Sequence, residues 1–518
     1  MNHSLTASSP VSKRLSPRKM AFITGTLLLT STGFICRILG FFYRIFMSRT
    51  IGAEGLGIYN MVHPIFSICF AVCAGSIQTA LSQYVAANQT RGRAVFRTGL
   101  VIAMGMSFLL AWVIYGNAGF LAEKLLLEPR CAPYLPVMAV SVPFAALHAC
   151  INGYYYGMQK ARVPAFSQVA EQVIRMGAVF LIASIWLESG RQITVSLAVY
   201  GHLIGEMASA VFTVFCLGFF PPCKDGDSRR APAIPLSFGA TAAPLMALAL
   251  PLMGNRLILN VLGSAEAIWI PNRLMSSGLT NSEALSVYGV LTSMALPFIL
   301  FPSAITNSIA VLLLPSVAKD QAEGRTESIS GSVSMALRYS LYMGILCIGI
   351  FVLFGCPLGI SVFKEEQAGH CMQILAWLCP FLYLAATMGS ILNGLGCTRT
   401  TFLQSVAAML LRLVFVVAGI PLFGIYGYLC GMLISEIFLA LAHLWSLKRR
   451  IPFTWNARDM IAKPAFFLFL ATGIHYFIAG FLPTPSGTMP LFFKTSGQIL
   501  VLSSCYGVLL LYAHILRK

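Results

Sequence analysis

Residues 143–175 read PFAALHACINGYYYGMQKARVPAFSQVAEQVIR, and residues 380–412 read PFLYLAATMGSILNGLGCTRTTFLQSVAAMLLR. The two stretches align at a constant offset of 237 residues. Apolar helices resemble one another by chance, but matches of Gly, Pro and Arg at one fixed offset favour a true internal repeat. The matched pairs are Pro143/Pro380, Phe144/Phe381, Gly157/Gly394, Arg162/Arg399, Val169/Val406, Ala170/Ala407 and Arg175/Arg412.

The repeat extends to neighbouring apolar segments. Further matches are Tyr200/Tyr426, Gly201/Gly427, Leu203/Leu429, Gly205/Gly431 and the pair Ser76-Ile77 with Ser308-Ile309. Six apolar segments therefore recur as six segments in the same orientation. Such a parallel repeat relates two lobes by an axis along the membrane normal, and a site between the lobes can face each side in turn.

The composition agrees with a membrane protein. Of 518 residues, 57% are hydrophobic and only 10% are charged, and the mean hydropathy is +0.79. A water-soluble domain carries about 25% charged residues, and disordered chains are far less apolar than this one. The predicted fold class is an all-α polytopic membrane protein.

A membrane-spanning helix needs about 20 apolar residues, and the sequence predicts fourteen such spans. These are residues 21–47, 56–84, 95–115, 134–156, 164–187, 192–219, 237–262, 284–314, 333–357, 371–395, 401–423, 424–447, 464–483 and 492–515. The predicted organisation is a cytoplasmic tail (1–20), an N-lobe (21–219), a cytoplasmic linker (220–236), a C-lobe (237–450) and two appended C-terminal helices (451–518).

The net charge of +18 reflects topology. Most of the 35 Lys and Arg residues fall in alternate connecting segments when both termini are placed inside, as expected for cytoplasmic loops. The sequence therefore predicts a multi-pass membrane protein with both termini cytoplasmic. Its basic segments meet anionic membrane lipids, and no nucleic-acid partner is expected.

Arginines within the spans point to an anion site. Arg37 and Arg44 are seven residues apart, so they share one helix face about 10 Å apart. Arg256 lies in the seventh span, which the repeat relates to the first, and Arg273 lies in the outer-side connection near the start of the eighth span. Guanidinium groups bind phosphate bidentately and stay charged, so the four residues are predicted to bind substrate. Alternatively, Arg44 and Arg273 extend to the outer lipid headgroups.

Other charges within the spans have structural or coupling roles. Glu171 precedes Arg175 by four residues, the favourable order for an intrahelical ion pair. Arg412 has no such neighbour, and Glu436 is its plausible partner, or else a cation or proton site. Glu206 is a further carboxylate at mid-depth, and such groups are costly in a membrane unless they pair or serve transport.

No enzyme signature is present. The sequence lacks a Walker loop, GxSxG and HExxH, and its 14 Cys form no CxxC pair or Cys/His metal spacing. Neither a cofactor nor a metal site is expected. Without a nucleotide site, transport would run on substrate or ion gradients.

Several motifs are similar to those of the stage V sporulation protein B family. They include GYYYGMQ at 153–159, EQVIR at 171–175, RILG at 37–40, GAEGLGIY at 52–59 and IPNRL at 270–274. That family belongs to the multidrug/oligosaccharidyl-lipid/polysaccharide exporter superfamily, which also contains the peptidoglycan lipid II flippases. The resemblance covers about residues 20–450.

The resemblance implies a V-shaped pair of six-helix lobes that flips an undecaprenyl-diphosphate-linked saccharide. Lipid II is the expected cargo, for cell-wall or spore-cortex peptidoglycan, and cell-wall synthesis enzymes are candidate partners. The cationic cavity residues of the flippases carry over onto Arg37, Arg44 and Arg273. Acidic ion-binding residues described in the seventh span of some relatives have no counterpart in 237–262, so a coupling ion, Na⁺ or H⁺, stays open.

Two alternatives remain. A cation-coupled drug antiporter of the same superfamily predicts carboxylates in the N-lobe cavity and no arginine cluster, whereas the sequence favours the arginines. A non-transporting scaffold for cell-wall or sporulation enzymes needs substantial soluble loops. The longest predicted connections, 220–236 and 263–283, are short for that role.

Overall fold

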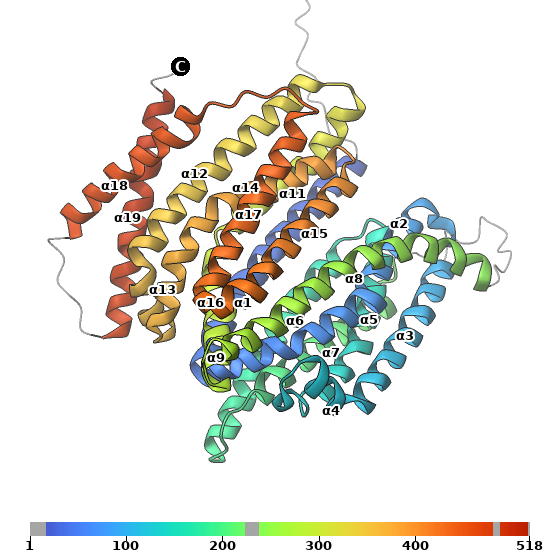
Figure 1. Ribbon diagram of the computed structural model, residues 1–518. Coiled ribbons are helices and arrows are strands. Elements are labelled where there is room, and N and C mark those ends of the chain that lie inside the picture. Colours follow the sequence, from blue (N-terminus) through green and yellow to red (C-terminus); the bar gives the residue numbers. More distant parts are fainter. Residues whose placement is uncertain (1–16, 223–237, 480–486, 516–518) are drawn as a thin grey trace, which may run out of the picture.

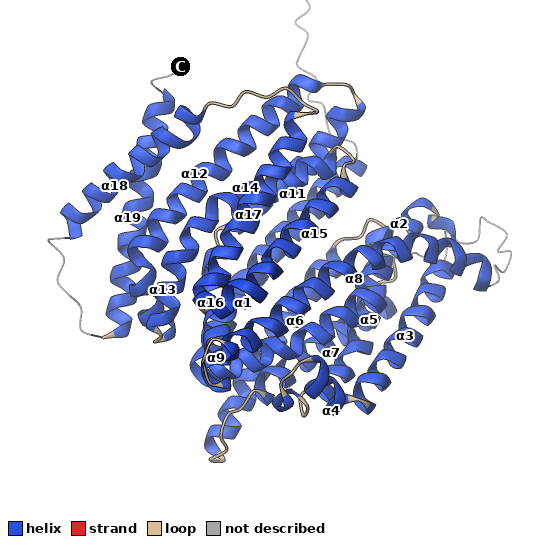
Figure 2. Ribbon diagram, in the orientation of Figure 1, coloured by secondary structure: helices blue, strands red, loops and turns tan. Residues whose placement is uncertain are grey.

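A computed structural model describes residues 17–222, 238–479 and 487–515. Within these ranges the chain forms helices and no strand (Figure 2), so the predicted all-α membrane fold is confirmed. Most of the predicted tail 1–20 and linker 220–236 lies outside the described residues.

The first half of the chain contains α1 (Pro17–Phe70), η1 (Ala71–Gly75), α2 (Ser76–Ala87), α3 (Gly92–Gly116), α4 (Ala118–Phe120), α5 (Leu135–Gly157), α6 (Arg162–Glu188) and α7 (Ser196–Phe219). The second half contains α8 (Phe238–Ser276), α9 (Asn281–Gly289), η6 (Val290–Ala295), α10 (Leu296–Leu300), α11 (Ser303–Ala322), α12 (Thr326–Leu358), η7 (Gly359–Phe363), α13 (Glu366–Leu375), α14 (Cys379–Gly394), α15 (Thr398–Val414), η9 (Phe415–Gly419), α16 (Ile420–Phe423), α17 (Ile425–Lys448), α18 (Lys463–Ala479) and α19 (Thr488–Ile515).

Thirteen helical segments among the described residues are long and apolar enough to span a membrane. The first, Leu28–Ala87, has 60 residues, which at 1.5 Å per residue is about three times the hydrocarbon thickness. At Gly52 the backbone turns to φ +71° and breaks the helical path. This segment therefore supplies two crossings, which agrees with the fourteen spans expected from the sequence.

Helix packing reproduces the sequence repeat. In the N-lobe α5 packs against α2, α3 and α7, and α6 packs against α7. In the C-lobe α14 packs in the same way against α11, α12 and α17, and α15 packs against α17. Helices α18 and α19 pack against each other and against α12, so they are appended to the C-lobe outside the repeat.

The two lobes join at one end of the molecule, beside α9, which we call the α9 end (Figure 1). One continuous hydrophobic core includes N-lobe residues such as Leu81 and C-lobe residues such as Phe354 and Leu378. The opposite end of the C-lobe has a separate core around Val333 and Leu392. The lobes therefore share buried contacts at the α9 end, and away from it α8 packs against α2 and α3 of the N-lobe.

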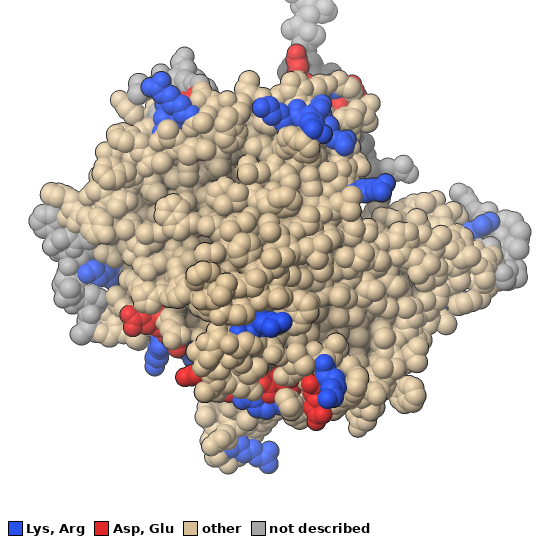
Figure 3. Space-filling view, in the orientation of Figure 1, with Lys and Arg blue, Asp and Glu red and all other residues tan. Residues whose placement is uncertain are grey.

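The charges frame a wide apolar belt. In Figure 3, Lys and Arg lie mainly at the upper and lower ends of the visible face, and Asp and Glu gather mostly at the lower one. Large hydrophobic side chains such as Trp112, Leu422 and Phe469 are highly exposed. A lipid bilayer provides the apolar surroundings that this belt requires.

Helix α8 connects the lobes. Near its start, the hydroxyl groups of Thr241 and Thr98 on α3 lie 2.6 Å apart, and near its end Glu266 pairs with Arg412 on α15. The sequence-based end of this span at residue 262 was wrong. The helix continues to Ser276, and the charge of Glu266 within it is paired with Arg412.

Direct hydrogen bonds hold the lobes together at the α9 end. Arg49 on α1 donates from Nε to the Val362 carbonyl at 2.7 Å and from a terminal nitrogen to the Ser361 carbonyl at 2.9 Å. Asn281 on α9 donates to the Glu128 carboxylate at 2.8 Å. Backbones also approach closely here, because a Cβ added at Gly289 would overlap the Ala53 carbonyl.

Candidate functional site

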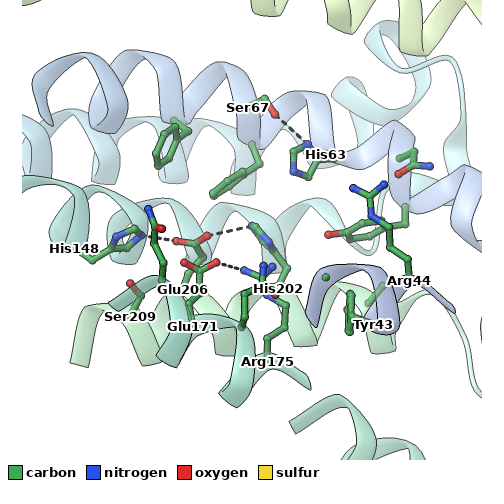
Figure 4. A pocket seen from close by; sticks show the side chains of 18 of the residues that line it. Tyr43, Arg44, His63, Ser67, His148, Glu171, Arg175, His202, Glu206 and Ser209 are labelled. Carbon is green, nitrogen blue, oxygen red and sulfur yellow. Dashed lines mark hydrogen bonds and ion pairs between the residues drawn. The ribbon is translucent and has the colours of Figure 1, made fainter. Parts of the chain in front are cut away.

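The principal candidate site is a cavity of about 700 Å³ in the N-lobe, bordered by the C-lobe (Figure 4). Helices α1, α5, α6 and α7 supply most of its wall, and Asn260 of α8 and Ser293 of η6 close one side. Its polar and aromatic lining includes Tyr43, Arg44, Tyr59, Asn60, His63, Ser67, Gln78, His148, Asn152, Tyr156, Gln168, Glu171, Gln172, Arg175, His202 and Glu206.

The four arginines predicted to bind substrate do not meet in this cavity. Arg44 lines it, whereas Arg37 and Arg273 are exposed elsewhere and are not part of its wall. Arg256 on α8 donates a hydrogen bond to the Thr79 hydroxyl at 2.9 Å. Sequence spacing placed Arg37 and Arg44 on one face of a helix, but only Arg44 lies where that face borders the cavity.

Glu171 and Arg175 form the predicted intrahelical ion pair. Both side chains are largely buried, with 20% and 15% exposure. Arg175 also lies directly against Gly205 of α7, where a Cβ would contact the guanidinium. The glycine thus leaves the room that the arginine needs between α6 and α7.

Glu206 lies between two histidines (Figure 4). His148 Nε2 of α5 is 2.8 Å from one carboxylate oxygen, and His202 Nε2 is 4.0 Å from the other. We call these three residues the Glu206 cluster. The site residues predicted from the sequence include Glu206 but neither histidine. The i,i+4 spacing of His202 and Glu206 was the available signal, whereas the approach of His148 required the tertiary fold.

Unsatisfied polar atoms concentrate in this cavity. Buried polar atoms normally have hydrogen-bond partners. Among the described residues, those without a partner are His148 Nδ1, Asn152 Oδ1, Gln172 Oε1, Arg175 Nε, His202 Nε2 and Arg338 Nε. All but the last belong to residues that line the cavity. The site therefore offers both donors and acceptors to a polar occupant.

A second charged cluster occupies the C-lobe. Arg412 on α15 donates to Glu436 of α17 at 3.0 Å and contacts Glu266 of α8 at 3.4 Å. Tyr428 donates its hydroxyl to Glu266. The predicted pairing of Arg412 with Glu436 is confirmed. The sequence missed Glu266, because the seventh span was ended four residues before it.

A buried carboxylate also stabilises the α9 end. Glu128 is 2% exposed and accepts a hydrogen bond from Arg130 Nε at 2.9 Å. Burial raises the pKa of the Glu128 carboxyl. Hydrogen bonds from Arg130 and Asn281 lower the pKa by more than burial raises it, so the pKa lies below its ordinary value. Glu128 therefore stays ionised and keeps its bond across the lobes at neutral pH.

Comparison with known proteins identifies the family. The model of the polysaccharide biosynthesis protein family matches residues 22–321, more than half of the chain. The chain belongs to this family.

Members of related groups match over most of their length. Stage V sporulation protein B of Bacillus subtilis (strain 168) is 25% identical over 511 residues, covering 96% of this chain and 97% of the relative. Lipid II flippase MurJ of the same organism is 20% identical over 465 residues, covering 84% of each protein. The resemblance to the sporulation protein family is thereby confirmed.

Solved structures show the same fold. The lipid II flippase MurJ in an inward closed conformation superposes with a TM-score of 0.72 at 14% identity, covering 95% of this chain and all of the other. An inward-facing multidrug resistance MATE family transporter superposes with a TM-score of 0.60 at 13% identity, covering 83% and 97%. The expectation of a transporter rather than an enzyme agrees with these relatives.

Neither cluster resembles a metal centre. In the described part of the chain, no group of three or more His, Cys, Asp or Glu side chains is arranged to hold a metal ion. The cysteines described there are free thiols, and most are buried among apolar neighbours.

Proposed function

We propose that this protein is a flippase that moves an undecaprenyl-diphosphate-linked saccharide, with lipid II as its cargo, across the bacterial cytoplasmic membrane by alternating access. The observation that carries the proposal is the concentration of unpartnered buried polar atoms in one cavity of the N-lobe, which the C-lobe borders. Such atoms cost free energy unless water or a polar ligand binds them. A sugar headgroup supplies matching donors and acceptors.

The lining suits a saccharide. Side-chain amides are numerous among its polar groups, and aromatic rings such as Tyr59 and Tyr156 offer flat apolar surfaces beside them. Specifically placed polar groups fix the orientation of a bound ligand. Arg44 provides the charge for one phosphate, and we propose Arg37, Arg256 and Arg273 as further phosphate contacts along the path of the cargo.

In this proposal both termini are cytoplasmic, so the α9 end faces outward. The outer side is then the closed side, held by Arg49, Asn281 and the contact of Gly289 with α1. Opening this side while the opposite side closes would expose the same cavity to each face of the membrane in turn. A coupling ion and cell-wall synthesis enzymes are proposed partners.

The test is lipid II exposure on the outer leaflet of bacteria depleted of their own flippase. Arg44→Ala and Asn152→Leu should each reduce exposure at least about tenfold at equal membrane protein level, since a contact of about 1.4 kcal/mol in the transition state is tenfold in rate. Arg399→Ala, an exposed arginine of the other lobe, is the control and should behave as the parent. Normal exposure with both cavity variants would contradict the proposal.

One observation favours a second candidate, a cation-coupled drug antiporter. That alternative predicts carboxylates in the N-lobe cavity, and Glu171 and Glu206 both line it. Efflux of a cationic dye from energised cells separates the two functions. Dye efflux that depends on Glu206, together with normal lipid II exposure in the Arg44→Ala variant, would favour the antiporter. If the variants change neither dye efflux nor lipid II exposure, a scaffold is favoured.

A further inference from the structure

The Glu206 cluster contains a buried carboxylate that is in contact with histidines and not with an arginine of the cavity. Glu171 is neutralised by Arg175 on the same helix, whereas Glu206 contacts two imidazoles and no guanidinium among the described residues. Glu206 is 6% exposed and His202 is 5% exposed. An isolated carboxylate is expensive at such burial, and a bound proton removes that cost.

The surrounding helices define the charges that this cluster experiences. From α6 come Glu171 and Arg175, which pair with each other. Helix α1 contributes Arg44, Tyr59 and His63. The Nδ1 atom of His63 is 3.0 Å from the Ser67 hydroxyl.

The remaining neighbours are neutral. The α8 and η6 side of the cavity contributes Asn260 and Ser293, which do not titrate. With His148 protonated, Glu206 and His148 together are neutral. Without that proton one negative charge remains in the cluster.

We propose that Glu206, His148 and His202 form a proton-binding site whose occupancy is coupled to the opening of the lobes at the α9 end. The inference rests on the alternating-access transport proposed above and names the proton as its coupling ion. Imidazole is the side chain whose charge changes between pH 5 and 8. The proton comes from water in the cavity and returns to it, so only N–H, O–H and hydrogen bonds are made and broken.

Two features of the cluster suit proton exchange. His148 Nδ1 and His202 Nε2 are both buried without a partner, so each ring has a free nitrogen position at the cavity. His202 is also 4.0 Å from the carboxylate, too far for a hydrogen bond and near enough for a small rotation to make one. The site therefore has a bonded and an unbonded imidazole for one carboxylate.

A short structural path joins this site to the lobe interface. His63 on α1 lies beside His202, with ring centroids 6.0 Å apart. One turn earlier on the same helix, Asn60 donates to the hydroxyl groups of Thr292 at 2.8 Å and Ser293 at 2.6 Å. Those two residues belong to η6 of the C-lobe, so movement of α1 affects the cluster and the lobe contact together.

Nitroxide labels on Ser189→Cys and Lys364→Cys test the proposal in a protein otherwise free of cysteine. Both positions are exposed, one in each lobe, near the α9 end. Pulsed electron paramagnetic resonance on samples frozen between about pH 5.5 and about pH 8.5 gives the ratio of long to short label distances. Proton loss leaves a buried charge, so the long-distance population should rise with pH by roughly fivefold or more.

Glu206→Gln should make this ratio independent of pH, and His202→Gln, which leaves the Glu206–His148 bond in place, should weaken or shift the dependence. His443→Gln is the matched control. His443 is a buried histidine of the C-lobe, 4% exposed and bonded to Gln404 rather than to a carboxylate, and this variant should keep the parental pH dependence.

A parental ratio that does not change with pH overturns the proposal, as does an unchanged pH dependence in both cluster variants. If Glu206→Gln does not fold, His202→Gln decides alone. The result is separable from the cargo assignment. If the cavity variants expose lipid II normally in cells while the label distances still depend on pH, the cargo assignment is wrong and the proton site stands.

Discussion

Arg175 and Arg412 lie 237 residues apart at equivalent positions of the two lobes, and each binds a glutamate of its own lobe. The partners differ, because Glu171 precedes Arg175 on the same helix and Glu436 lies on the helix after Arg412. The repeat therefore preserves a buried guanidinium on its fifth helix while the compensating carboxylate has changed place. This relationship supports two tests of charge pairing.

The first test concerns the N-lobe pair. Glu171→Gln should lower thermal stability in detergent, because it leaves Arg175 partly buried without its partner. The double variant Glu171→Gln with Arg175→Gln should recover much of that loss. A double variant as unstable as the worse single one would mean that each residue has another essential contact.

Arg412 should matter more for stability than the exposed Arg399 of the same helix. Arg412→Ala leaves Glu266 and Glu436 both without a counter-charge, and breaking such a buried pair costs about 3–5 kcal/mol. Arg399→Ala on the same helix is exposed and should cost little. Equal unfolding temperatures for the two variants would show that the cluster contributes nothing to folding.

Close packing at the α9 end gives a third prediction. Gly289→Val should disfavour the closed arrangement, because its side chain would overlap the Ala53 carbonyl, and overpacking costs about 1–3 kcal/mol. Gly254→Val on α8 has open space around the added atoms and is the control. The label distances between positions 189 and 364 report the effect, and an unchanged closed population in Gly289→Val would contradict this assignment.

The orientation in the membrane is a fourth prediction. In a cysteine-free background, Ser189→Cys and Ser277→Cys should react with an impermeant thiol reagent in intact cells. Thr90→Cys and Arg449→Cys should react only after permeabilisation. All four positions are exposed in the structure, so a reversed labelling pattern would mean that the termini are outside.

Acid should weaken the α9 end. A carboxyl whose folded-state pKa is depressed stabilises the fold above its unfolded pKa, about 4.3 for Glu, and loses that effect as the pH falls through the folded pKa. For Glu128 the shift is downward, so its contribution should be constant from pH 7 to about pH 5 and decline below about pH 4. The Glu128→Gln variant should be less stable than the parent at neutral pH and should lose less stability on acidification. Thermal unfolding at several pH values measures both effects.

The sequence predicted the fold class and the pairing of Glu171 with Arg175 because both depend on short, regular spacing. Apolar segment length sets the spans, and an i,i+4 separation places two side chains together on any helix. The repeat offset also carried real structural information, since equivalent helices pack equivalently in both lobes.

The candidate site was less predictable. Arg37 and Arg44 share a helix face, but which part of that face borders the cavity depends on the break at Gly52 and on how α6 packs beside α1. Glu266 was missed because polar residues near a span end resemble a loop until their partners are known. His148 was missed because it lies 58 residues before Glu206 on a different helix, and only the tertiary fold brings the two together.

Helix α8 has a practical consequence for dividing this chain. A cut between residues 223 and 237 would assign α8 to the C-terminal fragment, although its first half is bonded to α3 and α2 of the other fragment. That half-helix would act as a docking segment, so two separately expressed fragments should reassemble through it. Moving the cut to residues 277–280, beyond α8, would transfer the docking role to the Glu266 end of α8, which would then join the other fragment together with the contacts of the α9 end.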